Sequence, residues 1–141
     1  MIWRRAYDLA ELNELFNRYM TGFLEIKAEA IEENSIIASM PITEKVLQPF
    51  GILHGGASVV LAESVGSVAS ALIIDLDTHQ AVGLEVNANH LRPGKLGSRL
   101  LAYCTPIHLG RSTHVWDIKI KDDKDRLICI SRLTVAIVKK R

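Results

Sequence analysis

The 141-residue sequence has few cysteines, few aromatic residues and almost no net charge. Cys104 and Cys129 are its only cysteines, and each lies in an apolar, strand-like stretch. They are expected to be buried free thiols, which suits a reducing compartment. Lys and Arg number 17 against 16 Asp and Glu, and aromatic residues make up 6%. This balance gives no reason to expect nucleic acid or a membrane surface as a partner.

Targeting and membrane signals are also absent. The first residues, MIWRRAYDLAELNELF, lack the apolar core and the cleavage site of a signal peptide. The longest apolar run, 58–74, contains Glu63 and several serines, so it is a poor membrane span. We therefore expect a cytoplasmic protein.

Several catalytic and binding motifs are missing. Because G-x-S-x-G does not occur, a serine-hydrolase active site has no support. Neither G-x-G-x-x-G nor a phosphate-binding loop is present, and the five histidines show no metal-ligand spacing. We expect no metal ion and no redox cofactor.

The apolar periodicity predicts two helices. Residues 8–20 carry apolar side chains at helical spacing, with Asp8 in position to cap a short amphipathic helix. Residues from about 56 to 74 are small and aliphatic and contain no proline. That stretch is long enough for a buried helix of about five turns.

The remaining segments predict about six strands. Residues 23–32 and 35–41 flank the turn EEN and indicate a hairpin. In AVGLEVNANHL, the apolar residues Val82, Leu84 and Val86 alternate with polar ones and are expected on one face of a strand. Three further strands follow: SRLLAYCTPIHL, then STHVWDIKIKD, which alternates clearly, and LICISRLTVAIVKK, which is apolar on both faces like a central strand.

Because strands far outnumber helices, parallel βαβ winding is excluded. We predict one α+β domain spanning 1–141, with an antiparallel sheet of about six strands packed on the long helix and a short N-terminal helix. A helix that is apolar all round needs cover on every side, and one sheet covers only part of it. A second subunit is therefore expected.

One carboxylate, Glu63, stands alone in the apolar run QPFGILHGGASVVLAESVGS, residues 48–67. No Lys, Arg or His lies within one helical turn of it. A buried carboxylate normally pairs, shifts its pKa or becomes neutral. Either Glu63 lies at a helix edge and meets water, or it is an acid, base or nucleophile placed in a cleft.

The residues around Glu63 favour the second interpretation, a reactive group placed in a cleft. The HGG motif just before the helix leaves backbone N–H groups free at the positive end of the helix dipole, although the glycines could also serve only a tight turn. Ala62, Gly66 and Ala69 form a stripe of small residues that allows close approach. Ser67 lies one turn beyond Glu63 and could bond a ligand, although a lone helix serine is more often structural.

The distance along the helix constrains how these groups act together. Gly55 and Glu63 are eight residues apart, or about 12 Å of helical rise. One carbonyl can hardly contact both groups of the same chain at about 3 Å. If the helix begins near Gly55 and both residues act on one carbonyl, the site is shared across a dimer.

Three stretches, QPFGILHGGASVVLAESVGSVAS, VGLEVNANHLRP and PIHLGRSTHVW, resemble the hotdog-fold acyl-CoA thioesterases. The most similar group has a glutamate in the central helix and includes bacterial 1,4-dihydroxy-2-naphthoyl-CoA thioesterases and the enterobactin-pathway proofreading thioesterase. The resemblance runs nearly end to end. It implies a sheet wrapped around a central helix, dimers with shared active sites, and tetramers.

The resemblance also implies residue roles. Glu63 matches the catalytic carboxylate, as nucleophile or as general base, and Gly55 matches the backbone donor to the thioester oxygen. Gln48 and His54 match polar residues beside the thioester, Ser67 a residue near the acyl group, and Val68 the acyl contact. The implied path of the coenzyme A moiety is lined by Gly83, His90, Leu91, Arg92, Pro93, His108, Leu109, Gly110, Arg111, Ser112 and Thr113.

The expected reaction is hydrolysis of an acyl-CoA thioester, with the 1,4-dihydroxy-2-naphthoyl thioester of menaquinone synthesis as the favoured substrate. A broad aryl or fatty acyl-CoA specificity, or proofreading of an aryl carrier protein, is the alternative. Two other functions stay open. A hotdog dehydratase would use His54 and Glu63 to remove water across a Cα–Cβ bond, and a non-catalytic acyl-CoA binder would not need Glu63.

Overall fold

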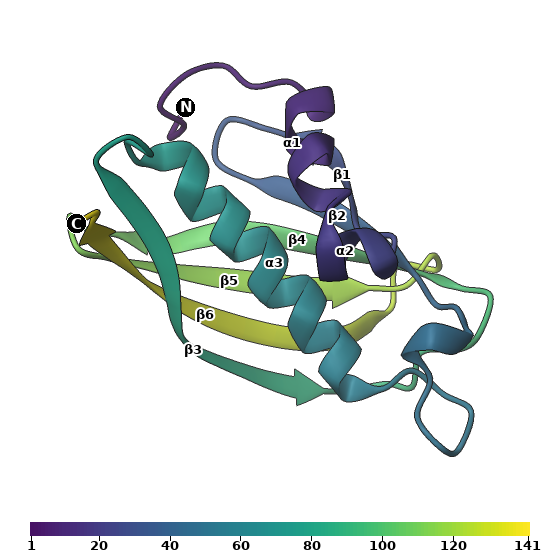
Figure 1. The fold of residues 1–141 in the computed structure, drawn as a ribbon. Coiled ribbons are helices and arrows are strands. Elements are labelled where there is room, and N and C mark those ends of the chain that lie inside the picture. Colours follow the sequence, from purple (N-terminus) through teal and green to yellow (C-terminus); the bar gives the residue numbers. More distant parts are fainter.

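The computed structural model describes residues 1–141 as a six-stranded antiparallel sheet curved around one long helix (Figure 1). The elements are, in chain order, α1 (Leu9–Phe16), α2 (Tyr19–Phe23), β1 (Lys27–Ile31), β2 (Ile36–Pro41), the 3-10 turn η1 (Glu44–Val46), α3 (Gly55–Ile73), β3 (His79–His90), β4 (Arg99–Leu109), β5 (Thr113–Lys121) and β6 (Leu127–Lys139). The predicted α+β class, strand number and long helix are confirmed.

The order of the strands in the sheet is β1-β2-β4-β5-β6-β3, and every neighbouring pair is antiparallel. The predicted hairpin around EEN is the β1–β2 pair. Between β2 and β3 the chain passes through α3 and reaches the opposite edge of the sheet. β6 bonds to neighbours on both sides, as its two-sided apolar sequence predicts.

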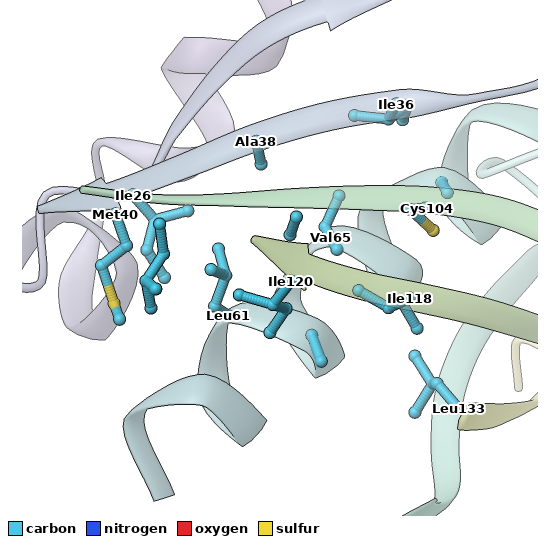
Figure 2. Packing of buried hydrophobic residues seen from close by; sticks show 14 of the residues in the cluster. Ile26, Ile36, Ala38, Met40, Leu61, Val65, Cys104, Ile118, Ile120 and Leu133 are labelled. Carbon is cyan, nitrogen blue, oxygen red and sulfur yellow. The ribbon is translucent and has the colours of Figure 1, made fainter. Parts of the chain in front are cut away.

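The helix α3 packs on the concave face of the sheet. Leu61 and Val65 are fully buried and point toward the buried side chains of β2, β4, β5 and β6 (Figure 2). At Gly66 an added Cβ would lie 2.5 Å from Cδ2 of Leu133, so the absence of a side chain lets β6 approach closely. Burial of this apolar surface is the main favourable contribution to folding.

By length and composition α3 could also cross a membrane, since its mean hydropathy reaches 1.6. Nearly half of it is buried inside this fold, and it contacts five of the six strands. It is the core helix of the domain.

The predicted single helix over 8–20 is two helices. Its start is capped as expected, because Asp8 accepts a hydrogen bond from the Glu11 N–H at 2.9 Å and the Glu11 carboxylate accepts one from the Asp8 N–H at 3.0 Å. Tyr19 has a φ of +53°, a left-handed conformation that separates α1 from α2. The apolar spacing continues across this break, so periodicity alone did not reveal it.

The strand β3 contains a β-bulge between Gly83 and Glu85, where Leu84 is the extra residue. Directly paired residues of two strands point to the same face, so an extra residue reverses the alternation. Val82 therefore lies on the outer face of the sheet and Val86 on the helix side. The prediction that Val82, Leu84 and Val86 share one face is wrong.

A buried polar contact joins the helix to the sheet. The Ser70 hydroxyl on α3 accepts a hydrogen bond from Nε1 of Trp116 at 2.8 Å and lies 3.1 Å from Nδ1 of His114, both on β5. Burial lowers the pKa of His114, and the nearby His108 lowers it further. The ring of Trp3 stacks on the ring of Trp116, and this contact fixes the N-terminal segment against β5.

Both cysteines are buried and free, as predicted. Burial raises the pKa of the Cys104 thiol, with a further contribution from the charge of Asp117. Burial also raises the pKa of Cys129. The two thiols are therefore poor nucleophiles and act as small apolar core residues.

The β5–β6 turn is organised by the buried carboxylate of Asp122. It accepts hydrogen bonds from the Lys124 N–H at 3.0 Å, the Arg126 N–H at 2.9 Å and Nε of Arg126 at 2.8 Å. Burial alone would raise the pKa of Asp122. The hydrogen bonds from Arg126 and Lys124 outweigh it and leave the pKa below its ordinary value.

Replacing Asp122 by alanine should lower the free energy of unfolding by about 2 kcal/mol near pH 7, because the charged acceptor of three hydrogen bonds is lost. Since the folded-state pKa of Asp122 is lowered, its contribution is complete above the unfolded pKa of about 4 and is lost as the pH falls through the folded value. Urea unfolding of the wild type and of Asp122→Ala between pH 7 and pH 3 measures the free energy of unfolding of each. The difference between the two free energies should shrink below about pH 4. Asp123→Ala, at the exposed neighbour, serves as the control, and a constant difference across the range would contradict the role of Asp122.

Candidate active site

The first group of candidate residues surrounds the start of α3, which begins at Gly55, as the reach estimate assumed. His54 is the N-cap residue, and its Nδ1 accepts a hydrogen bond from the Gly56 N–H at 2.8 Å. The Gly55 N–H has no hydrogen-bond partner in the chain. A free N–H at the positive end of a 19-residue helix is a site for a carbonyl oxygen or an oxyanion.

A cleft of about 520 Å³ opens at this helix start. It is lined by Gln48, Ile52, Leu53, Gly55, Ser58, His90, Leu91, Arg92, Pro93, Gly94 and Ile128. Seven of the residues predicted from the sequence concern this end of the molecule, and six of them line the cleft: Gln48, Gly55, His90, Leu91, Arg92 and Pro93. The seventh, His54, is exposed beside it.

Within the cleft the imidazole of His90 lies against the helix start. A Cβ at Gly55 would be 2.7 Å from Nε2 of His90, so a side chain here would displace the imidazole. Gln48 accepts a hydrogen bond from the Phe50 N–H through its carbonyl oxygen, which leaves its amide N–H groups without a partner. Arg92 donates to the Leu127 carbonyl at 3.1 Å and is otherwise exposed.

The second group lies two helical turns further along α3. Glu63 is half-buried and lines a separate cavity of about 300 Å³ together with Leu15, Phe16, Thr21, Ser64, Ser67 and Val68. Its Oε1 lies over β3, where a Cβ at Gly83 would be only 2.6 Å away. The carboxylate has no hydrogen-bond donor and no cation as a partner in the chain.

Gly83 therefore serves two purposes in β3. It adjoins the bulge, and it leaves room for the Glu63 carboxylate above the strand. Glu63 is thus an unpaired, half-buried carboxylate on an apolar helix, which makes it a candidate acid, base or nucleophile.

The third group, His108–Thr113, forms the β4–β5 turn. The Gly110 N–H donates to the Thr113 carbonyl at 2.9 Å, and Arg111 and Ser112 are exposed. Figure 1 shows this turn at the end of the sheet where the C-terminus lies, whereas α3 begins at the opposite end. Within one chain, the turn reaches neither the cleft at Gly55 nor the cavity at Glu63.

Some lining residues carry no signal in the sequence. Leu15, Phe16 and Thr21 lie more than 40 positions before Glu63 and contribute to its cavity only because α1 and α2 fold over α3. Ser58 lines the cleft beside Gly55, and its buried hydroxyl has no hydrogen-bond partner. An unpaired buried hydroxyl is unusual and is recognisable only from the structure.

Comparison with known proteins identifies the family. A family model described as the thioesterase superfamily matches residues 50–129. The 1,4-dihydroxy-2-naphthoyl-CoA hydrolase of Escherichia coli is 50% identical over 138 residues, which cover 98% of this chain and 100% of that protein. The proofreading thioesterase EntH of Klebsiella pneumoniae is 40% identical over 138 residues, which cover 98% of this chain and 99% of that protein.

Solved structures agree with the sequence relatives. The crystal structure of a mutant thioesterase from Pseudomonas aeruginosa superposes with a TM-score of 0.96 at 48% identity and covers 99% of this chain and 100% of that chain. Together with the family model, which matches more than half of the residues, these similarities leave one assignment. The chain belongs to the thioesterase superfamily and adopts the hotdog fold predicted from its sequence.

Proposed function

We propose that the protein hydrolyses acyl-CoA thioesters, R–CO–S–CoA, with water to a free carboxylate and the coenzyme A thiol. The observation that carries this proposal is the pair of unsatisfied groups on one helix: the free N–H of Gly55 and the unpaired carboxylate of Glu63. A thioester needs these two functions, one group to polarise its oxygen and one to activate a nucleophile.

In this mechanism the Gly55 N–H donates to the thioester oxygen, and the helix dipole stabilises the negative charge that develops there. Two routes then use Glu63. As a general base it removes a proton from water, whose oxygen adds to the carbonyl carbon before the thiolate leaves. As a nucleophile it adds to the carbon itself, the thiolate leaves, and water hydrolyses the resulting mixed anhydride. Neither route uses a metal ion or a redox cofactor.

The neighbouring residues support these steps. His54 caps the helix through Nδ1, which holds the first turn so that the Gly55 N–H points away from the helix. The free amide group of Gln48, which lines the cleft, is assigned as a second donor to the thioester. Ser67 and Val68, in the cavity of Glu63, are assigned to the acyl group.

The proposed active site is shared between two subunits. Gly55 and Glu63 lie in different cavities of one chain, and the β4–β5 turn lies at the far end of the sheet. A two-fold axis that sets two α3 helices antiparallel would bring Gly55 of one chain beside Glu63 of the other. The proposed assembly is a homodimer of this kind, paired into a homotetramer in the cytoplasm.

The coenzyme A moiety is assigned to the opening of the cleft. His90 and the following run Leu91–Pro93 form its wall in one chain, and the partner would add its turn with Arg111, Ser112 and Thr113. Arginine side chains and hydroxyls are the usual donors to phosphate groups. The proposed partners of the protein include neither nucleic acid nor a membrane.

The proposed acyl group is 1,4-dihydroxy-2-naphthoyl, an intermediate of menaquinone biosynthesis. The relative that carries this name is 50% identical, against 40% for the proofreading thioesterase. Hydrolysis of other aryl and fatty acyl thioesters, including proofreading of carrier-bound aryl groups, is the second candidate, because apolar pockets separate related acyl groups only modestly.

Replacing Glu63 by glutamine should reduce kcat for aryl-CoA hydrolysis by about 10²- to 10⁴-fold, because the amide keeps the shape but neither attacks nor accepts a proton. Thiol release measured with Ellman's reagent reports the rate, and the exposed variant Glu33→Gln is the control. A folded Glu63→Gln protein with full activity would exclude both routes and bring the dehydratase and binder functions forward.

The Gly55 N–H is tested by two substitutions at the same position. Alanine and proline both add a Cβ near His90, but only proline removes the N–H, and proline is tolerated at the first helical residue. Gly55→Pro should therefore have a kcat about 10²- to 10³-fold below that of Gly55→Ala. Equal kcat values for the two variants would show that this N–H does not act on the thioester.

Complementation tests the shared site. In a heterodimer of a Gly55→Pro chain and a Glu63→Gln chain, one of the two sites combines both wild-type residues. Heterodimers isolated through two different affinity tags should therefore regain about half of the wild-type activity per dimer. A heterodimer of two differently tagged Glu63→Gln chains is the control. Failure of the mixed pair to exceed its inactive parents would place each complete site within one chain.

A further inference from the structure

The cavity beside Glu63 has a wall that the proposed mechanism does not use. Leu15 and Phe16, from α1, and Thr21, from the middle of α2, line it together with Ser67 and Val68 of α3. Phe16 is fully buried and anchors the wall in the core, whereas Leu15 keeps 47% of its surface exposed. An exposed leucine at the rim of a cavity is available to contact a ligand.

Several hydrogen bonds hold this wall in place. Asn13 on α1 bonds both backbone groups of Ala28 on β1, accepting at 2.8 Å and donating at 3.2 Å. The Thr21 hydroxyl lies 2.7 Å from the Phe16 carbonyl and 2.9 Å from the Arg18 carbonyl, which closes the junction between the helices. At Gly22 an added Cβ would lie 2.3 Å from the Asn17 carbonyl oxygen, so the junction is tightly packed. The wall is therefore tied to β1 and packed closely at its junction.

We propose that this N-terminal segment, residues 9–23, closes the acyl pocket of its own chain and that Leu15 is the residue that limits the length of the acyl group. This inference rests on the proposed thioester hydrolysis, because the acyl group must lie beside the carboxylate that acts on its carbonyl carbon. The pocket adjoins Glu63, and the only segment covering it from outside α3 is α1–α2.

The volume of the pocket indicates what it holds. An apolar cavity of about 150 Å³ accommodates one benzene ring. The pocket measures about 300 Å³ and is open to solvent on one side, so two fused aromatic rings can enter it. A long acyl chain needs further room along its length, and it meets Leu15 and the anchored Phe16 instead.

Two opposite substitutions of Leu15 test the role of the wall. Leu15→Ala removes the side chain at the rim, and Leu15→Trp fills the pocket. The control is Leu9→Ala, because Leu9 lies on the same helix, keeps 37% of its surface exposed and does not line the cavity. The substrates are benzoyl-CoA, 2-naphthoyl-CoA and palmitoyl-CoA, each followed by thiol release, with thermal melting to verify that every variant is folded.

Leu15→Ala should raise kcat/KM for palmitoyl-CoA relative to 2-naphthoyl-CoA by about 10-fold or more, the discrimination that a few methylene groups provide. Leu15→Trp should lower kcat/KM for 2-naphthoyl-CoA by about 10-fold or more while benzoyl-CoA changes less, since one ring still fits. Leu9→Ala should keep the wild-type order of substrates.

The outcomes separate this inference from the proposed function. Active, folded Leu15 variants that keep the wild-type order would show that the segment is not the acyl wall, and thioester hydrolysis would stand. A wild-type protein that hydrolyses none of the three thioesters would refute the proposed function. Calorimetric binding of the non-hydrolysable 2-naphthyl thioether of coenzyme A then tests the wall, and affinities equal in wild type and Leu15→Trp would overturn it.

Discussion

The close packing of α3 on the sheet is the constraint on which the other features depend. The helix is covered by strands from both halves of the chain, and small residues set its distance from them. Gly66 admits the side chain of Leu133, and Gly83 admits the carboxylate of Glu63. A methyl group at either glycine would lie 2.5 to 2.6 Å from these atoms, so the side chain of Leu133 or of Glu63 would have to shift. The position of Glu63 in its cavity follows from the same packing that forms the core.

Along this helix the fold leaves polar groups without partners. The Gly55 N–H, the Ser58 hydroxyl and the Glu63 carboxylate all lack one within the chain. Elsewhere the buried polar groups are paired, as Ser70 with Trp116 and Asp122 with Arg126 show. Folded chains generally satisfy buried polar groups, and of these three only the Ser58 hydroxyl is buried.

The site residues are distributed over three places in one chain: the helix start with Gln48 and His90, the middle of the helix with Glu63, and the β4–β5 turn. The sheet keeps these places apart because it is rigid and the turn lies at its far end (Figure 1). These candidate groups therefore lie apart in one chain. The spacing of Gly55 and Glu63 in the sequence, about 12 Å of helical rise, agrees with their separate cavities.

The sequence by itself determined the class of fold, the long helix, the capped N-terminal helix and the candidate groups Glu63 and Gly55. These features depend on local periodicity, on capping residues and on one polar residue in an apolar run, which are all visible along the chain. Tertiary structure alone decided the break at Tyr19, the bulge at Leu84 and the wall formed by Leu15. Each of these depends on how distant segments pack, since a bulge is defined by its partner strand and a cavity by elements far apart in sequence.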